Sequence, residues 1–306
     1  MNKMDRRTFL RQLQGMLCFA GASMLFPPAL AAQEKNPDIS VVKGDIEPAV
    51  KKAVEMLGGI ERFVKKGNRV VIKPNMSFDT GPERASNTHP EVIRTLAEMC
   101  RKAGADRVLV LDNPLRPAEK CIENSGIGAA CDSVEKGMAR TVTDPSRFSE
   151  VKISDAKSLK KTEVMKEVLN ADVLIAAPVA KSHSGAGVSL SMKGMMGLIS
   201  DRGVMHRLDL HESITDLASL LTPRLTVIDA SRVLSSGGPG GPGKVLTPET
   251  IIASADMVAA DAYAVSEFEW YGGRYNPDQI KHIRMAHQRK IGRMDIENMK
   301  IGRTSV

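Results

Sequence analysis

The feature that most constrains this chain is a repeated alternation of short apolar runs with amphipathic segments. Runs rich in Val, Ile, Leu and Ala occur as "RVVIK" at 69–73, "RVLVLDN" at 107–113, "DVLIAAP" at 172–178 and "RLTVIDA" at 224–230. Segments with helical spacing lie between them, for example "HPEVIRTLAEMCRKAGA" at 89–105. Continuous aliphatic strands that alternate with helices are typical of a parallel sheet covered on both faces. The predicted class is α/β, with a mostly parallel, doubly wound sheet.

The chain shows no internal repeat and no low-complexity tract that would divide it. At 306 residues and 42% hydrophobic composition, it is long enough for one large α/β domain with a sizeable core. We expect that single domain to span 32–306, with helix–strand units such as a helix at 161–171. The least regular part, at 114–158, is predicted to be an insertion beside the sheet.

The first 31 residues have the composition of an export signal. Arg6 and Arg7 precede an apolar run and the small residues "ALAA". This order is typical of a twin-arginine signal peptide, recognised by the twin-arginine translocation machinery. The expected location is periplasmic, with no stable membrane anchor after cleavage. Removal of four basic residues and one acidic residue lowers the formal net charge from +7 to +4, which does not indicate a nucleic-acid-binding protein.

Three cysteines remain after the expected cleavage, namely Cys100, Cys121 and Cys131. Their spacing matches no zinc or iron–sulfur pattern. A disulfide between Cys121 and Cys131 and a set of buried free thiols are both compatible with the sequence.

Polar side chains stand where several of the apolar runs end. Lys73 and Asn75 follow the first run, Asp112 ends the second, and Asp229 lies at the end of the fourth. Ligands of open parallel sheets bind beyond the carboxyl ends of the strands. These four residues are therefore predicted to contribute to a substrate or anion site at that edge.

The stretch "PVAKSHSGAGVSLSMKGMMGLISDR" at 178–202 follows the third run and carries Lys181, His183 and Lys193 among several glycines. Backbone amides of a glycine-rich loop and nearby lysines favour an anion. The segment is therefore predicted to bind a small anionic ligand. A mobile surface loop is the alternative interpretation of this segment. The "GGPGGPG" loop at 237–243 is compatible with a flexible flap and with contact to an anion.

The other histidines have separate interpretations. His89 precedes a predicted helix, and His206 follows the glycine-rich stretch. His282 and His287 lie on a late charged helix and are expected at the surface. The HExxH pattern of zinc proteases is absent.

The elements "KPN", "THPE" and "KSHSGAGVSLSMK", together with "LTVIDA", "GGPGGPG" and "IIASADMVAADA", resemble the domain-of-unknown-function family numbered 362. The resemblance covers nearly the whole chain after the signal. Many members carry a ferredoxin-like insert with four cysteines, and this sequence has none, so no iron–sulfur cluster is expected. Lys193 is followed by Gly194, where the family usually has asparagine.

The spacing of His183 and Lys193 is also similar to that of the nickel-pincer lactate racemase family. That resemblance implies acid–base roles for His183 and His89, a cofactor-carrying role for Lys193, and metal binding by His206. It implies nickel, or iron, as the metal and α-hydroxy acids as substrates.

Two functional hypotheses follow. The first is an exported enzyme or cofactor-binding protein that uses a Lys/His anion site, with metal-dependent chemistry on a small carboxylate or phosphate. The second is a non-catalytic periplasmic protein that binds a metal or an anion and serves a redox complex.

Overall fold

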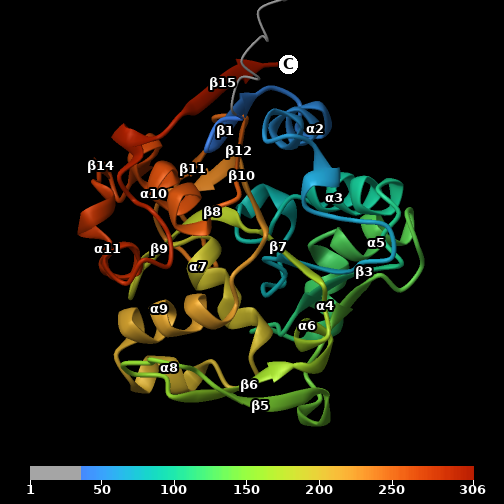
Figure 1. Cartoon of the computed structure of the whole chain (residues 1–306), viewed down its shortest axis with the longest axis horizontal. Helices are drawn as coiled ribbons and strands as arrows, with labels where there is room; N and C mark the ends of the chain where they lie inside the picture. Colours follow the sequence, from blue (N-terminus) through green and yellow to red (C-terminus); the bar gives the residue numbers. More distant parts are fainter. Residues whose placement is uncertain (1–35) are drawn as a thin grey trace, which may run out of the picture. The chain divides into compact units, whose positions relative to one another are not determined.

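An 11-stranded sheet forms the centre of the protein (Figure 1). The computed structural model describes residues 36–306, which form one compact unit. Eight strands follow the order β15-β1-β12-β10-β7-β2-β3-β4, and β8, β9 and β11 are attached through β8 and β10. Within that order only β12 runs antiparallel to its neighbours. The predicted mostly parallel α/β fold is confirmed.

The sheet strands are β1 (Ile39–Lys43), β2 (Arg69–Pro74), β3 (Arg107–Asp112), β4 (Ala139–Thr141), β7 (Val173–Ala177), β8 (Val179–His183), β9 (Gly187–Ser189), β10 (Leu225–Leu234), β11 (Val245–Leu246), β12 (Thr250–Ser254) and β15 (Ile301–Ser305). Two separate hairpins are β5 (Phe148–Lys152) with β6 (Lys161–Met165), and β13 (Glu269–Trp270) with β14 (Gly273–Arg274). The helices are α2 (Ile46–Met56), α3 (Pro90–Lys102), α4 (Ala118–Asn124), α5 (Ile127–Asp132), α6 (Lys166–Leu169), α7 (Ser191–Gly194), α8 (Gly203–Arg207), α9 (Leu210–Leu220), α10 (Met257–Glu267) and α11 (Lys281–Gln288).

Helices cover both faces of the sheet, and each face has its own apolar core. Val70 and Ile72 of β2 pack into one core beneath α2 and α3, whereas Val71 between them packs into the other. This follows from the alternation of side chains along a strand. In Figure 1, α2, α3 and α5 lie together on one side, and α7, α9, α10 and α11 lie on the other.

Two expected segments differ from the structure. The helix expected at 161–171 is wrong, because 161–165 form β6, which pairs antiparallel with β5, and only 166–169 are helical. Thr162 and Val164 are buried on one side of that strand, so tertiary pairing overrides the local helical preference. The stretch 114–158 holds α4 and α5, and its strand β4 extends the main sheet beside β3.

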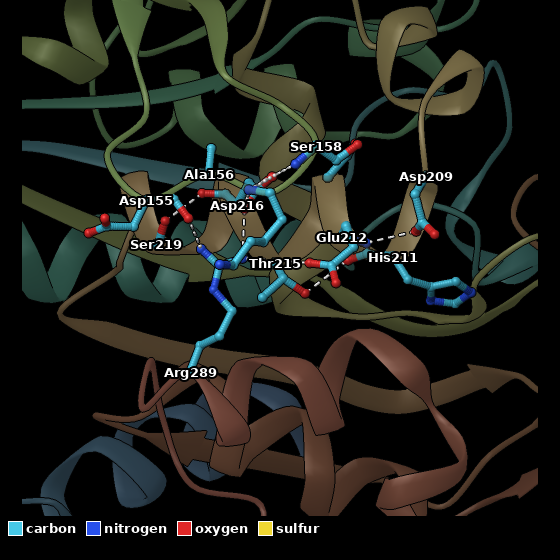
Figure 2. Close-up of polar contacts among 12 residues, drawn as sticks. Asp155, Ala156, Ser158, Asp209, His211, Glu212, Thr215, Asp216, Ser219 and Arg289 are labelled. Atoms are coloured by element: carbon cyan, nitrogen blue, oxygen red, sulfur yellow. Dashed lines mark hydrogen bonds and ion pairs between the residues drawn. The ribbon is translucent and has the colours of Figure 1, made fainter.

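A buried carboxylate ties the loop of the β5–β6 hairpin to α9 and to Arg289 (Figure 2). Asp216 of α9 accepts hydrogen bonds from the backbone amides of Lys157, Ser158 and Leu159 at 2.8–3.1 Å. It also pairs with Arg289, just after α11, at 2.6 Å. One side chain thus joins three elements that are distant in sequence.

The expected signal peptide at 1–31 lies outside the described residues. Within 36–306, no helix combines the length and the apolar composition needed to cross a bilayer. Cys100, Cys121 and Cys131 are all buried and free, so the structure favours the thiol alternative.

Candidate functional site

A cavity of about 250 Å³ opens at the carboxyl ends of β2, β3 and β8. Seven of the residues expected at this edge line it: Lys73, Asn75, Asp112, Lys181, His183, Lys193 and His206. We call this cavity the lysine pocket. Segment 178–202, which lines much of it, is a largely buried run of strands and helices, so the surface-loop interpretation is wrong.

Lys73 and Asp112 form a buried ion pair at the ends of neighbouring parallel strands. Their Nζ and Oδ1 atoms lie 3.2 Å apart, and the two side chains are 2% and 1% exposed. Asp112 Oδ2 also accepts hydrogen bonds from the Met76 amide at 2.8 Å and the Ser77 hydroxyl at 2.9 Å. Burial lowers the pKa of Lys73, and Asp112 opposes that shift. The pair therefore contributes little net charge to the pocket.

Lys181 is buried in β8 without a carboxylate partner among the described residues. Its Nζ donates to the Ser86 carbonyl at 2.5 Å and lies 4.8 Å from the centre of the Phe78 ring. Burial lowers the pKa of Lys181 to about 7; the charge of Asp112 opposes the shift, and repulsion from Lys73 and Lys193 adds to it. A carbonyl and an aromatic face stabilise a cation only partly, because neither carries a full negative charge.

Lys193 and Arg202 are the other cations of the pocket. Within 36–306, Lys193 Nζ donates a hydrogen bond only to the Met196 sulfur, at 3.4 Å, and sulfur is a weak acceptor. Burial and then Arg202 lower the pKa of Lys193 to about 8. The partly buried Arg202 side chain makes no ion pair or hydrogen bond within 36–306; burial lowers its pKa, and the charge of Asp112 opposes that shift.

Helix α7, which carries Lys193, is held at its beginning by a carboxylate from another helix. Asp261 of α10 is fully buried, and its two oxygens accept from the Ser191 and Met192 amides, each at 2.9 Å. These amides have no partner inside the helix, so the carboxylate satisfies them and places the short helix. Burial raises the pKa of Asp261 to about 7, against the lowering effect of these hydrogen bonds.

His183 and His206 stand beside the lysines as a stacked pair, with ring centres 6.2 Å apart and planes 19° apart. His183 Nδ1 accepts from the Gly185 and Ala186 amides at 3.1 and 3.2 Å. The proton of the neutral ring is therefore on Nε2. Burial, then Lys193 and His206, lowers the pKa of His183 to about 3, so the ring is neutral at neutral pH.

Asn75 and the glycine-proline loop complete the pocket. Asn75 Oδ1 accepts from the Val179 amide at 3.0 Å and so joins the end of β2 to the start of β8. Pro239 of the 237–243 loop lines the pocket, and the Gly238 amide donates to the Ser182 hydroxyl at 3.0 Å.

His89 and Asp229 do not line the lysine pocket. His89 faces a second cavity of about 630 Å³, together with Arg232 and the first turns of α2 and α3. Its Nδ1 accepts from the Glu91 amide at 3.2 Å and so caps α3. Asp229 is fully buried and accepts from the His89 amide at 2.7 Å. The connection after β2 directs His89 to α3, so His89 does not face His183 across the lysine pocket.

The described residues do not fit a metal centre at His206. No group of three or more His, Cys, Asp or Glu side chains within 36–306 could hold a metal ion. Partial burial lowers the pKa of His206, and the positive charges of the neighbouring Lys193 and Arg202 lower it further. Two cations close to the ring oppose a metal cation, so we derive no chemistry through nickel or iron.

His282 is also not where the sequence placed it, since it is fully buried rather than at the surface. It stacks on His211 of α9, with Nδ1 atoms 3.3 Å apart. The face of α11 that carries His282 packs against α9, which explains its burial.

Three contributors were missed from the sequence: Arg202, Phe78 and Asp261. Arg202 closes the stretch 178–202, and Phe78 follows Asn75 closely, so both lie next to recognised signals. Asp261 is an acidic residue inside the otherwise apolar run "MVAADAYAV", which could have identified it as a buried functional group.

Comparisons with known proteins agree with this fold. The chain is 27% identical over 233 residues to a thylakoid-associated protein of Synechocystis sp., covering 71% of this chain and 68% of that protein. The structure of this chain is similar to that of the lactate racemase apoprotein from Thermoanaerobacterium thermosaccharolyticum, with a TM-score of 0.51 and 17% identity over 76% of this chain. This chain covers 58% of the racemase, less than two thirds of its length, and the likeness shows a shared fold.

A Thermotoga maritima crystal structure matches over 80% of this chain and 60% of its own, at 12% identity and a TM-score of 0.38, too low to support an inference. The family model described as "Domain of unknown function (DUF362)" matches residues 70–266, which include every residue of the lysine pocket. The chain belongs to the domain of unknown function 362 family.

Proposed function

We propose that this protein binds a small anionic metabolite in the lysine pocket. One observation carries the proposal: Lys181 and Lys193 are buried, Arg202 lies partly buried beside them, and none of the three forms an ion pair with a carboxylate of the described chain. An unpaired buried charge costs several kcal/mol even after relaxation. A bound anion removes that cost, because each cation then gains a charge-assisted hydrogen bond.

The dimensions of the pocket favour a small ligand. Its volume of about 250 Å³ lies below the range of roughly 300–1,000 Å³ that drug-sized ligands occupy. The proposed ligand is therefore a short carboxylate or phosphate compound.

Calorimetric titration with inorganic phosphate tests the proposal. Lys181→Met and Lys193→Met each remove one cation and keep most of the apolar stem, so each should weaken phosphate binding about tenfold or more. Lys136→Met is the matched control, since Lys136 is exposed and outside the pocket. Equal affinity in all four proteins, or no binding of phosphate or succinate to the wild type, would reject the proposal.

A second candidate is acid–base catalysis on the bound anion. It is favoured by the lowered pKa values of Lys181 and Lys193, whose neutral amines can accept a proton, and by His183, whose fixed neutral tautomer leaves Nε2–H as a hydrogen-bond donor to a substrate oxygen. Exchange of the α-hydrogen of malate or lactate in D₂O, followed by proton NMR, tests it. We expect exchange that His183→Gln abolishes while phosphate binding persists. No exchange in the wild type leaves the second hypothesis, a non-catalytic accessory binding protein, as the function.

We also propose that residues 1–31 direct export through the twin-arginine route, as the sequence predicts. The support is the Arg6-Arg7 pair followed by an apolar run. Replacement of both arginines by lysine should retain the protein in the cytoplasmic fraction, and unchanged periplasmic recovery would contradict the proposal.

A further inference from the structure

The lysine pocket holds more positive charge than a ligand with one negative charge can neutralise. Four cationic side chains line it, and Asp112 is its only carboxylate among the described residues. Asp112 is already paired with Lys73 at 3.2 Å. His183 adds no charge near neutral pH, because burial lowers its pKa to about 3, and the pKa of His206 is also lowered by burial. Lys181, Lys193 and Arg202 are left without an ion pair of their own among residues 36–306.

The three unpaired cations act on one shared space. Lys193 lowers the pKa of Lys181, and Arg202 lowers the pKa of Lys193, so each repels the next. They reach the pocket from different elements, since Lys181 lies in β8, Lys193 in α7 and Arg202 just before α8. A ligand that neutralises them must therefore present negative charge in more than one direction.

The pocket also has an apolar side. Phe78, Leu115, Met196 and Pro239 line it together with the cations. Such surfaces gain from contact with carbon atoms rather than from contact with water or a bare inorganic ion. The ligand is therefore expected to carry its anionic groups on a short carbon skeleton.

We propose that the lysine pocket selects a small organic dianion, such as a phosphate monoester or a short dicarboxylate, over a monocarboxylate of the same size. This inference rests on the proposed anion-binding function and names the ligand class of the same site. A monocarboxylate can neutralise only one of the three cations, whereas a dianion can neutralise two of them.

Selective binding of a dianion should also be accompanied by proton uptake. At about pH 8, Lys181, with a pKa of about 7, is mostly neutral, and Lys193, with a pKa of about 8, is roughly half protonated. A bound dianion stabilises the charged form of both lysines, so binding should draw protons from the buffer. The uptake must exceed that caused by a monoanion.

Calorimetric titration of the mature protein with propionate, succinate and glycerol phosphate tests the proposal. The titrations are made at about pH 8 in two buffers that differ in ionisation enthalpy, which yields affinity and proton uptake together. We expect succinate or glycerol phosphate to bind about tenfold or more tightly than propionate, with uptake of roughly half a proton or more per ligand. The stronger of the two dianions identifies the anionic group.

Two variants locate the effect. Arg202→Gln should bring the ratio of dianion to propionate affinity toward one, and Lys181→Met should reduce proton uptake; Lys136→Met should change neither. Circular dichroism confirms that each variant is folded. Equal wild-type affinities for propionate and both dianions overturn this inference and leave the anion-binding proposal standing. No binding of any probe overturns both.

Discussion

At the scale of single residues, the Lys73–Asp112 ion pair in the lysine pocket has room only because residue 197 is a glycine. Gly197 is fully buried, and a Cβ built on it would lie 2.0 Å from Asp112 Oδ1 and 2.5 Å from Lys73 Cε. Contacts this close do not occur, so even one methyl group must displace the pair. The glycine is required here by close approach, since its φ lies outside the left-handed region.

Gly197→Ala should therefore lower the free energy of unfolding by about 1–3 kcal/mol, as overpacking does. Gly194→Ala is the matched control, because the nearest atom to its Cβ is Pro178 Cβ at 4.0 Å. That control should leave stability unchanged or raise it by up to about 1 kcal/mol, since alanine favours a helix. Urea unfolding measures both, and equal stability of the two variants would show that the pocket floor is not closely packed.

At the scale of elements, buried carboxylates join pieces of chain that cannot hold their own positions. Helix α7 has only four residues, too few to be stable alone, and Asp261 of α10 binds its first amides. The β5–β6 hairpin lies outside the main sheet and is tied to α9 by Asp216. The same hairpin meets the pocket segment, because the Ser200 amide donates to the Glu163 carbonyl at 2.9 Å.

Asp216→Ala should lower the free energy of unfolding by about 3 kcal/mol, because it leaves Arg289 and several buried amides without their partner. Glu212→Gln is the control, since Glu212 lies 3.8 Å from Arg289 and makes only a weak ion pair. It should change stability by less than about 0.5 kcal/mol. Denaturant unfolding compares the two, and a loss shared equally by both would place the stabilisation in the Glu212 pair instead.

At the scale of the whole molecule, buried cations make stability depend on pH. Lys181 has a pKa of about 7 in the folded protein, against an ordinary value of 10.5. Between these values the unfolded chain holds a proton that the folded protein does not, so stability rises with pH. Lys193 acts in the same direction above about 8. Asp261 acts in the opposite direction, but only below about 7.

The free energy of unfolding of the ligand-free protein should therefore rise between about pH 7 and 9, by roughly 1 kcal/mol per pH unit. Above that window the buried thiols of Cys100 and Cys131, whose pKa values are raised to about 12, oppose the trend. Lys181→Met should flatten the rise, and saturating phosphate should reduce it. Urea titrations across the window measure the slope, and a flat wild-type profile would contradict the buried-lysine description.

Much of the fold was predictable because it follows from local periodicity. The aliphatic runs at 69–73, 107–113 and 224–230 are strands, and the amphipathic segment at 89–105 contains α3. The helix predicted at 161–171 was wrong because a distant contact, not local periodicity, decides the structure there. Val164 becomes part of a strand because β5 lies opposite, and β5 is a contact that local spacing does not reveal.

The candidate site was predictable to the extent that chain direction decides it. Lys73 and Asp112 end adjacent parallel strands, so their meeting follows from the strand pattern alone. The placement of His89 and His183 in different cavities does not follow from the strand pattern, because it depends on where the chain turns after β2. The roles proposed for these residues stay predictions until ligand binding is measured.

By itself, the sequence determined an α/β sheet whose strand ends carry lysine, histidine and aspartate, since strand and helix periods and strand direction are local properties. Only the tertiary structure decided which of these groups share one cavity, that Arg202 joins them, and that Lys181 and Lys193 are buried with no carboxylate partner in the described part of the chain. Burial and charge balance depend on distant elements such as α10 and the hairpin, and no local pattern encodes the distance between them.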